Sequence, residues 1–292
     1  MAPTDPVVQS NGHDPDPRPA CKVVWAIPDE GYTQSEALAN IRLLSFHHGK
    51  LEAQAAQDRT GPRWEFSLFH YGRLFTPLAR EYAAKAALSI GAEYLLMTDN
   101  DGIFPIDLFE RLVRHQVDIV APLAFTRNDP YLPVIYCMEE GFDTATRKPY
   151  SMSRYVTKYP KNAVVECDAV GFHAVLIRMA IFQKISPPYF FNLASTGEDI
   201  YFCLRARKEA GARVFCDTSI STGHLTKPSI VDEAFAMAYW RDGLHMDPDK
   251  GMGSVSRYQS VPMAPGGQPY TLGNMNVEST DTIPHHAKVV AQ

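Results

Sequence analysis

The sequence predicts a mixed α/β domain whose sheet is mostly parallel and flanked by helices. Two observations lead to this prediction. From residue 22 to residue 122, short apolar runs alternate with segments of helical periodicity, and after residue 130 the strands lose that regular order. The chain has 292 residues, of which 45% are hydrophobic and 21% charged, so it is long enough to bury a core without disulfides or structural metals.

The first three elements are predicted as strand, helix and strand. Lys22–Ile27 (KVVWAI) is an apolar run that stops at Pro28, as buried strands do. Ser35–Phe46 carries apolar residues at helical spacing, and Trp64–Tyr71 alternates its side chains as a strand does. This order begins a parallel sheet with right-handed crossovers.

The next four elements continue the alternation. Leu78–Ile90 places a row of alanines on one face and predicts an amphipathic helix. Tyr94–Thr98 (YLLMT) predicts a buried strand that leads directly into an Asp-Asn-Asp triplet. Asp107–His115 predicts a short helix whose first acid suits the helix dipole, and Asp118–Pro122 predicts a further strand.

The rest of the chain is predicted to be less regular, with mixed strands and two tails. We expect strands at Val134–Met138, Ala163–Cys167 and Arg213–Cys216, a strand or helix start at Ala174–Ile177, and helices at Met179–Ile185 and Glu198–Ala210. Residues 1–20 and 246–292 are rich in Pro, Gly, Ser and Asn, which predicts a disordered N-terminal tail and a loop-rich C-terminal tail or flap. One domain is therefore expected over residues 21–245.

Charge, cysteines and hydropathy narrow the functional classes. The net charge is −5 and no basic run occurs, so there is no strong nucleic-acid signal. Five cysteines at scattered spacings, without a CxxC, fit reduced thiols better than disulfides or a zinc site. No apolar run approaches the roughly 18 residues of a membrane span, and the N-terminus lacks the features of a secretory signal. We expect a cytoplasmic protein without an integral membrane segment.

The Asp99-Asn100-Asp101 triplet is the sharpest candidate site. It follows a buried strand, and ligands of open α/β sheets bind at the carboxyl ends of strands. Residues two apart in extended chain project to one side, so Asp99 and Asp101 can share a divalent cation, Mg²⁺ or Mn²⁺, that bridges to substrate phosphates. Asn100 is expected beside the nucleotide. The alternative interpretation is a solvated turn that ends a strand.

Glu198 and Asp199 are the candidate catalytic acids. They open a predicted helix, where one carboxylate facing a cleft could take the proton from an acceptor hydroxyl as general base. The alternative is that both merely stabilise the positive end of the helix dipole.

Five further residues complete the candidate site. His224 follows the last predicted strand and is a candidate third metal ligand, the alternative being a surface histidine. Arg80 could bind a phosphate or a base edge, or be a surface arginine. Pro28, Asp29 and Glu30 follow the first strand, where the base and ribose of a nucleotide would lie in a nucleotide-binding fold.

Several segments resemble GT-A glycosyltransferases, in particular family-2-like members. Ala79–Leu112 (ARxxAAKAALxxGAEYLLMTDNDxxFPxDLxxRL) resembles their central segment with its DxD motif, and Asp168–Ile185 resembles their acceptor-side region. GEDIYFCLRARKEAGARVFCD resembles the ED motif with its helix and following strand, and the Gly223-His224 pair resembles a late metal histidine. Together these segments span roughly residues 22–226.

The resemblance implies a GT-A (Rossmann-like) fold, a nucleotide-diphosphate sugar donor such as a UDP- or GDP-sugar, a hydroxyl acceptor and a divalent cation. It implies that Asp101 and His224 touch the metal, that Asp99 lies by the ribose or the metal, and that Asp199 or Glu198 is nearest the acceptor. The QxxRW signature of processive members is absent, which argues against a membrane-coupled synthase.

Two other functions are considered. A sugar-phosphate nucleotidyltransferase would usually carry a basic, glycine-rich loop after the first strand, and Pro28–Tyr32 has neither lysine nor a glycine cluster. A non-catalytic nucleotide- or glycan-binding module of the same fold is the third possibility. The intact acids and histidine argue against it.

Overall fold

The computed structural model describes residues 16–29, 31, 33–59, 61–193, 196–226 and 230–241, and four residue pairs (253–254, 260–261, 271–272 and 275–276). Most of the two predicted tails, residues 1–15 and most of 246–292, therefore lies outside the described residues. Of the remainder of the N-terminal segment, Arg18 pairs with Asp16 and Ala20 begins the first strand. Among the described residues, no helix has the length and apolar character needed to cross a bilayer.

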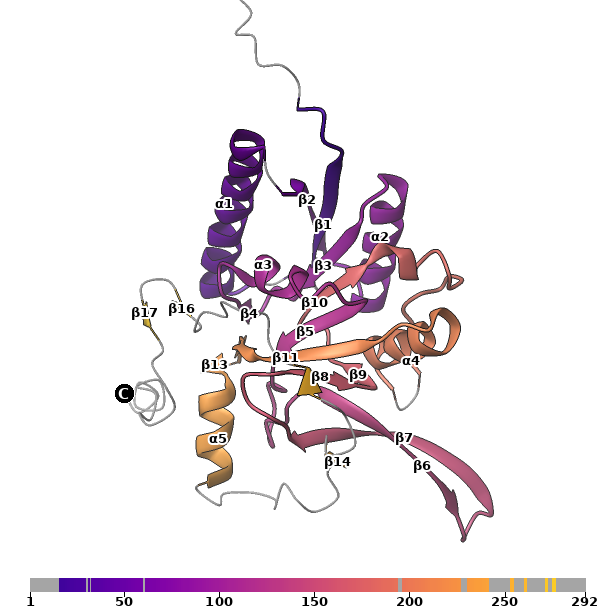
Figure 1. The fold of residues 1–292 in the computed structure, drawn as a ribbon. Coiled ribbons are helices and arrows are strands. Elements are labelled where there is room, and N and C mark those ends of the chain that lie inside the picture. The colour runs from indigo at the N-terminus through magenta and orange to yellow at the C-terminus, as the bar shows by residue number, and fades with distance from the viewer. Residues whose placement is uncertain are drawn as a thin grey trace, which may run out of the picture.

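The core of the molecule is an eight-stranded sheet with helices on both faces (Figure 1). This confirms the predicted mixed α/β fold. The strands in chain order are β1 (Ala20–Asp29), β2 (Arg63–Gly72), β3 (Tyr94–Thr98), β5 (Ile119–Leu123), β8 (Val164–Cys167), β10 (Ala174–Arg178), β11 (Val214–Ser221) and β15 (Ser260–Val261).

Across the sheet the strands run in the order β15-β8-β11-β5-β10-β3-β1-β2. β1, β2 and β3 are mutually parallel, and so are β5 and β11. β10 lies antiparallel between β3 and β5, and so interrupts the parallel half that the sequence predicts. The start of β10 therefore lies beside the carboxyl end of β3, although the two strands are more than 70 residues apart in the chain.

The helices cover the sheet in two layers, and each layer has its own apolar core. Along β1, Val24 and Ala26 face one core, and Val23, Trp25 and Ile27 face the other, as the alternation of a strand requires. The helices are α1 (Ser35–Asp58), α2 (Thr76–Ser89), α3 (Leu108–Val113), α4 (Glu198–Ala210) and α5 (Glu233–Arg241), with a 3₁₀ turn at Met179–Ile181.

Three local predictions differ from the structure. α1 continues to Asp58 instead of ending at Phe46, because Leu51 and Ala55 extend its apolar face and Gly49 does not end it. Residues 179–185 form only a 3₁₀ turn. The strand predicted at 134–138 is longer and belongs to a hairpin outside the main sheet.

Smaller sheets complete the fold. The hairpin of β6 (Ile135–Asp143) and β7 (Lys148–Lys158) extends away from the body and pairs with β9 (Ala169–Val170) and β14 (Gly253–Ser254) (Figure 1). β4 (Gly102–Ile103), β12 (Gly223–Leu225) and β13 (Ile230–Val231) form a short sheet beside the carboxyl end of β3. β16 (Thr271–Leu272) pairs with β17 (Met275–Asn276).

Candidate functional site

Two short strand pairings bring distant residues to the carboxyl end of β3. β4 follows the Asp-Asn-Asp triplet and pairs with β12 so that His224 lies opposite Gly102, and the backbone amide of Leu225 donates to the carbonyl of Asp101 (2.8 Å). On the other side, the backbone amide of Asp99 donates to the carbonyl of His173 (2.8 Å), just before β10 begins. Two histidines therefore converge on the triplet.

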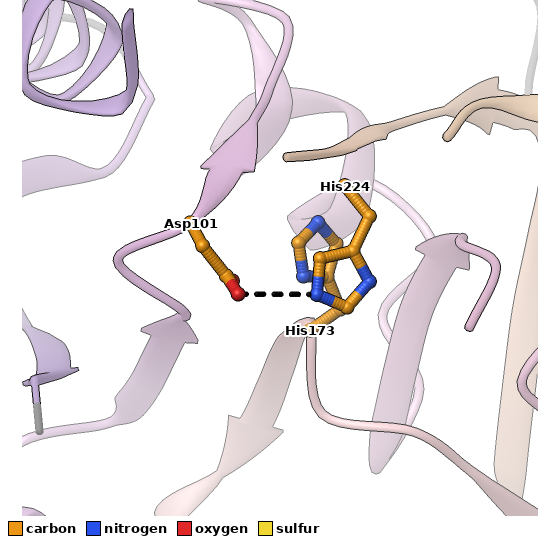
Figure 2. A group of neighbouring side chains, drawn as sticks. All are labelled: Asp101, His173 and His224. Atoms are coloured by element: carbon orange, nitrogen blue, oxygen red, sulfur yellow. Dashed lines mark ion pairs between the residues drawn. The ribbon is translucent and has the colours of Figure 1, made fainter. Parts of the chain in front are cut away.

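Asp101, His173 and His224 form a candidate cation site (Figure 2). Each offers one ligand atom, and these three atoms lie within 4.8 Å of one another. His224 Nε2 is 3.3 Å from Asp101 Oδ2, and the two imidazole rings stack with centroids 4.2 Å apart. Asp101 and His224 come together as predicted, whereas His173 was not among the predicted ligands.

The backbone orients both histidines toward this site. His224 Nδ1 is 2.9 Å from the carbonyl of Phe125, and His173 Nε2 is 3.1 Å from the carbonyl of Gly223. A carbonyl only accepts, so each of these nitrogens carries a hydrogen, and the opposite nitrogen of each ring is the one that can bind metal. His173 Nδ1 is buried and has no hydrogen-bond partner among the described residues, which leaves this nitrogen available as a metal ligand.

The pKa shifts of Asp101 and His224 fit a cation site. Burial alone would raise the pKa of Asp101, but the hydrogen bond from His224 and the nearby positive charges lower that pKa to about 2. Burial disfavours the imidazolium of His224, yet the hydrogen bond to Asp101, the charges of Asp101 and Asp99 and the hydrogen bond to Phe125 together outweigh burial and raise the pKa of His224. A cation at this site would replace the proton that His224 shares with Asp101. Two imidazoles and one carboxylate suit Mn²⁺ better than Mg²⁺, which prefers oxygen ligands.

Arg80 joins the two acidic motifs of the sequence. Its side chain is buried, and its guanidinium donates to Glu198, to Asp99 Oδ1 (2.8 Å) and to the carbonyl of Phe172 (2.9 Å). The surface interpretation of Arg80 is therefore wrong. Asp99, predicted as a metal ligand, is held by Arg80 and lies outside the three-residue cluster, although its Oδ2 is 3.7 Å from His173 Nδ1.

Two cavities adjoin the cation site, and they share Thr76, Asp99, Arg127 and His224. The first, of about 330 Å³, is also lined by Pro28, Gln34, Asn100 and Asp101. The second, of about 450 Å³, extends to Glu198 and Asp199. Of the predicted nucleotide residues, Pro28 and Asn100 line only the first cavity, Asp99 lines both, and Arg80 lines the second cavity together with the predicted catalytic acids.

Asp29 reaches the first cavity only through other side chains. It is buried, and its carboxylate accepts from the backbone amide of Gly31 (2.7 Å), from Asn100 Nδ2 (2.8 Å) and from His70 Nε2 (2.9 Å). It therefore fixes the amide of Asn100, which lines the cavity with Pro28. Glu30, the third residue predicted on this loop, lies outside the described residues.

The pKa of Asp199 is raised. Burial, and then the neighbouring charge of Glu198, raise its pKa to about 6. Its Oδ1 accepts only the backbone amide of Ile200 (2.7 Å) among the hydrogen bonds of the described residues, whereas Glu198 is bound by Arg80. Of the two predicted acids, Asp199 is therefore better suited to act as a base.

Replacement of Gly102 by Ala should damage both the core and the cation site. A Cβ on Gly102 would overlap the ring of Phe104 and lie 2.9 Å from His173 Cε1. We expect a loss of about 1–3 kcal/mol in the free energy of unfolding, together with weaker Mn²⁺ binding because His173 must move. Urea unfolding and Mn²⁺ titration measure the two effects. Gly49→Ala in α1 is the control, because a Cβ there meets no atom within 4 Å; equal effects of the two substitutions would contradict the prediction.

Comparison with known proteins gives structural likenesses only. No family model matches the sequence. No curated protein matches it. Similar solved structures include A197 from STIV (16% identity, 71% of this chain and 87% of that chain, TM-score 0.44). Another is a UDP-glucose pyrophosphorylase complexed with UDP-glucose (8% identity, 77% of this chain and 100% of that chain, TM-score 0.40). A third is a 4-diphosphocytidyl-2C-methyl-D-erythritol synthase from Anaerococcus prevotii (9% identity, 66% of this chain and 87% of that chain, TM-score 0.32).

Proposed function

We propose that this chain is a metal-dependent glycosyltransferase of the GT-A type, which transfers a sugar from a nucleotide-diphosphate donor to a hydroxyl acceptor. One observation carries the proposal. A candidate cation site borders two adjoining cavities, one lined by residues at the carboxyl ends of β1 and β3 and the other containing a carboxylate of raised pKa. A transferase needs adjoining positions for donor and acceptor, since the acceptor hydroxyl must reach the sugar carbon of the bound donor.

On the donor side, the first cavity would hold the nucleotide against Pro28 and Asn100. Asp101, His173 and His224 would hold the divalent cation, with Asp99 kept close by Arg80. When bound there, the cation would act as a Lewis acid that neutralises the charge developing on the nucleoside diphosphate leaving group.

On the acceptor side, the second cavity would bring a hydroxyl group to Asp199. The carboxylate would accept the proton of that hydroxyl as it attacks the sugar carbon. Glu198 would act differently, because its ion pair with buried Arg80 anchors the start of α4 and positions the neighbouring Asp199.

The proposed reaction is tested by identifying the product. The protein is incubated with Mn²⁺ and UDP- or GDP-sugars, and released nucleoside diphosphate is measured with and without candidate acceptors. In parallel it is incubated with nucleoside triphosphate and sugar 1-phosphate, and pyrophosphate is measured. We expect Mn²⁺-dependent release of nucleoside diphosphate. Pyrophosphate production would instead indicate a nucleotidyltransferase, and neither product would indicate a binding module.

The pH dependence of turnover should follow Asp199. The base must be deprotonated, so activity should be full above pH 7 and fall about tenfold per pH unit below about pH 6, where its carboxylate becomes protonated. The measurement is kcat/KM between pH 5 and 8 with Mn²⁺ kept saturating at each pH. A rate that stays constant down to pH 5 would exclude Asp199 as the base.

A further inference from the structure

Arg127 and a cation at the candidate site would compete for the same carboxylate oxygen. Arg127 Nη1 lies 2.6 Å from Asp101 Oδ2, which is also the oxygen that faces His224 Nε2 at 3.3 Å. The guanidinium and a divalent cation both carry positive charge. A divalent cation bound to Asp101 Oδ2 would therefore repel the guanidinium and weaken its bond to that oxygen.

The displacement requires only a side-chain movement. Arg127 belongs to a loop that is closed at its base, where Thr126 and Leu132 exchange two hydrogen bonds of 2.9 Å. Its side chain is 57% exposed, whereas that of Asp101 is only 16% exposed. Ion pairs with such an exposed partner contribute little to stability, so a cation can replace the guanidinium at small cost.

The position of Arg127 indicates where the released guanidinium would go. The residue lines both cavities, at the border where they adjoin beside the cation site. The diphosphate of a nucleotide donor bound to the cation would lie at this border. The planar guanidinium can donate parallel hydrogen bonds to phosphate oxygens, and its positive charge would offset part of the negative charge of the diphosphate.

We propose that Arg127 is an exchange residue: it occupies Asp101 in the free protein and transfers to the donor diphosphate when a divalent cation takes its place. This inference rests on the proposed function and adds to it a mechanism of coupling. Cation and nucleoside diphosphate would each promote the binding of the other, because the cation frees the arginine that the diphosphate needs. The affinity of the protein for the cation would therefore be lower when no donor is bound.

The test compares wild type, Arg127→Gln and Arg127→Lys by calorimetric titration of Mn²⁺, and of UDP and GDP with and without Mn²⁺. In Arg127→Gln we expect Mn²⁺ alone to bind about fivefold more tightly, because the competing charge is gone. Nucleoside diphosphate should bind about tenfold more weakly with Mn²⁺ present but equally well without it. Arg127→Lys, which keeps the charge, should lie between wild type and Arg127→Gln.

The control is Arg147→Gln, which removes the same charge from the exposed turn between β6 and β7 and should change none of these affinities. Weaker or unchanged Mn²⁺ binding in Arg127→Gln would overturn the inference, and so would an equal loss of nucleotide affinity with and without Mn²⁺. If wild type binds neither UDP nor GDP in the presence of Mn²⁺, the proposed function fails, while the Mn²⁺ titration alone still decides whether Arg127 competes with the cation.

Discussion

Asp199→Asn should lower turnover by about 10²- to 10⁴-fold, because it removes the carboxylate that we propose as the general base. The amide oxygen can still accept the hydrogen bond from the backbone amide of Ile200, so the local structure is kept. The folded protein raises the pKa of Asp199, which means that it disfavours the carboxylate at neutral pH. The variant should therefore be at least as stable as wild type at pH 7, and at the same time almost inactive.

The measurements are kcat, the affinity for Mn²⁺ and donor, and the melting temperature. Glu209→Gln, at the exposed end of the same helix α4, is the matched control and should behave as wild type. An equal loss of donor affinity and turnover in Asp199→Asn would assign Asp199 to donor binding instead of to proton transfer.

Arg80→Met should cause the largest loss of stability, about 3 kcal/mol. The guanidinium is buried, and without it Asp99 and Glu198 would face each other uncompensated. The value is at the lower end for a broken buried ion pair, because the side chain of Asp99 is 24% exposed and keeps some hydration. Loss of Arg80 would also raise the pKa of Asp199 further, which shifts the acid limb of the pH profile upward.

Urea unfolding of Arg80→Met, Arg80→Lys and Arg213→Met tests this prediction. Arg213 pairs with Glu166 at the surface, with 59% of its side chain exposed, so its loss should cost less than about 1 kcal/mol. Arg80→Lys keeps the charge but not the fork of donors, and should lie between wild type and Arg80→Met. Equal losses for Arg80→Met and Arg213→Met would show that the Arg80 bridge contributes no special stability.

Much of the fold and part of the site could be predicted because they depend on local pattern. The strand Tyr94–Thr98 and the helix Glu198–Ala210 have the bounds that their periodicity indicates. The meeting of Asp101 and His224 could also be predicted, since both follow strands whose ends lie at the same edge of the sheet.

The remaining features depend on contacts that no local pattern records. His173 joins the cation site because β10 inserts antiparallel between β3 and β5, and its neighbours in the sequence are apolar core residues. A histidine directly before a strand that pairs with the strand of the triplet is the signal that could have found it. The sequence alone allows Arg80 to be exposed or buried. Its burial follows from the packing of α2 against the ends of β3 and α4, which no local pattern records.

The central claim is that Asp101, His173 and His224 together hold a divalent cation, and Mn²⁺ titration of single variants tests it most directly. Wild type should bind one Mn²⁺. Substitution of a residue that only supports a metal ligand weakens metal binding roughly 10- to 100-fold. Asp101→Asn, His173→Ala and His224→Ala each remove a ligand, so each should weaken Mn²⁺ binding by more than that. His47→Ala on α1 is the control. Unchanged Mn²⁺ affinity in His173→Ala would contradict the account, because the residue that only the structure reveals would then play no part in the site.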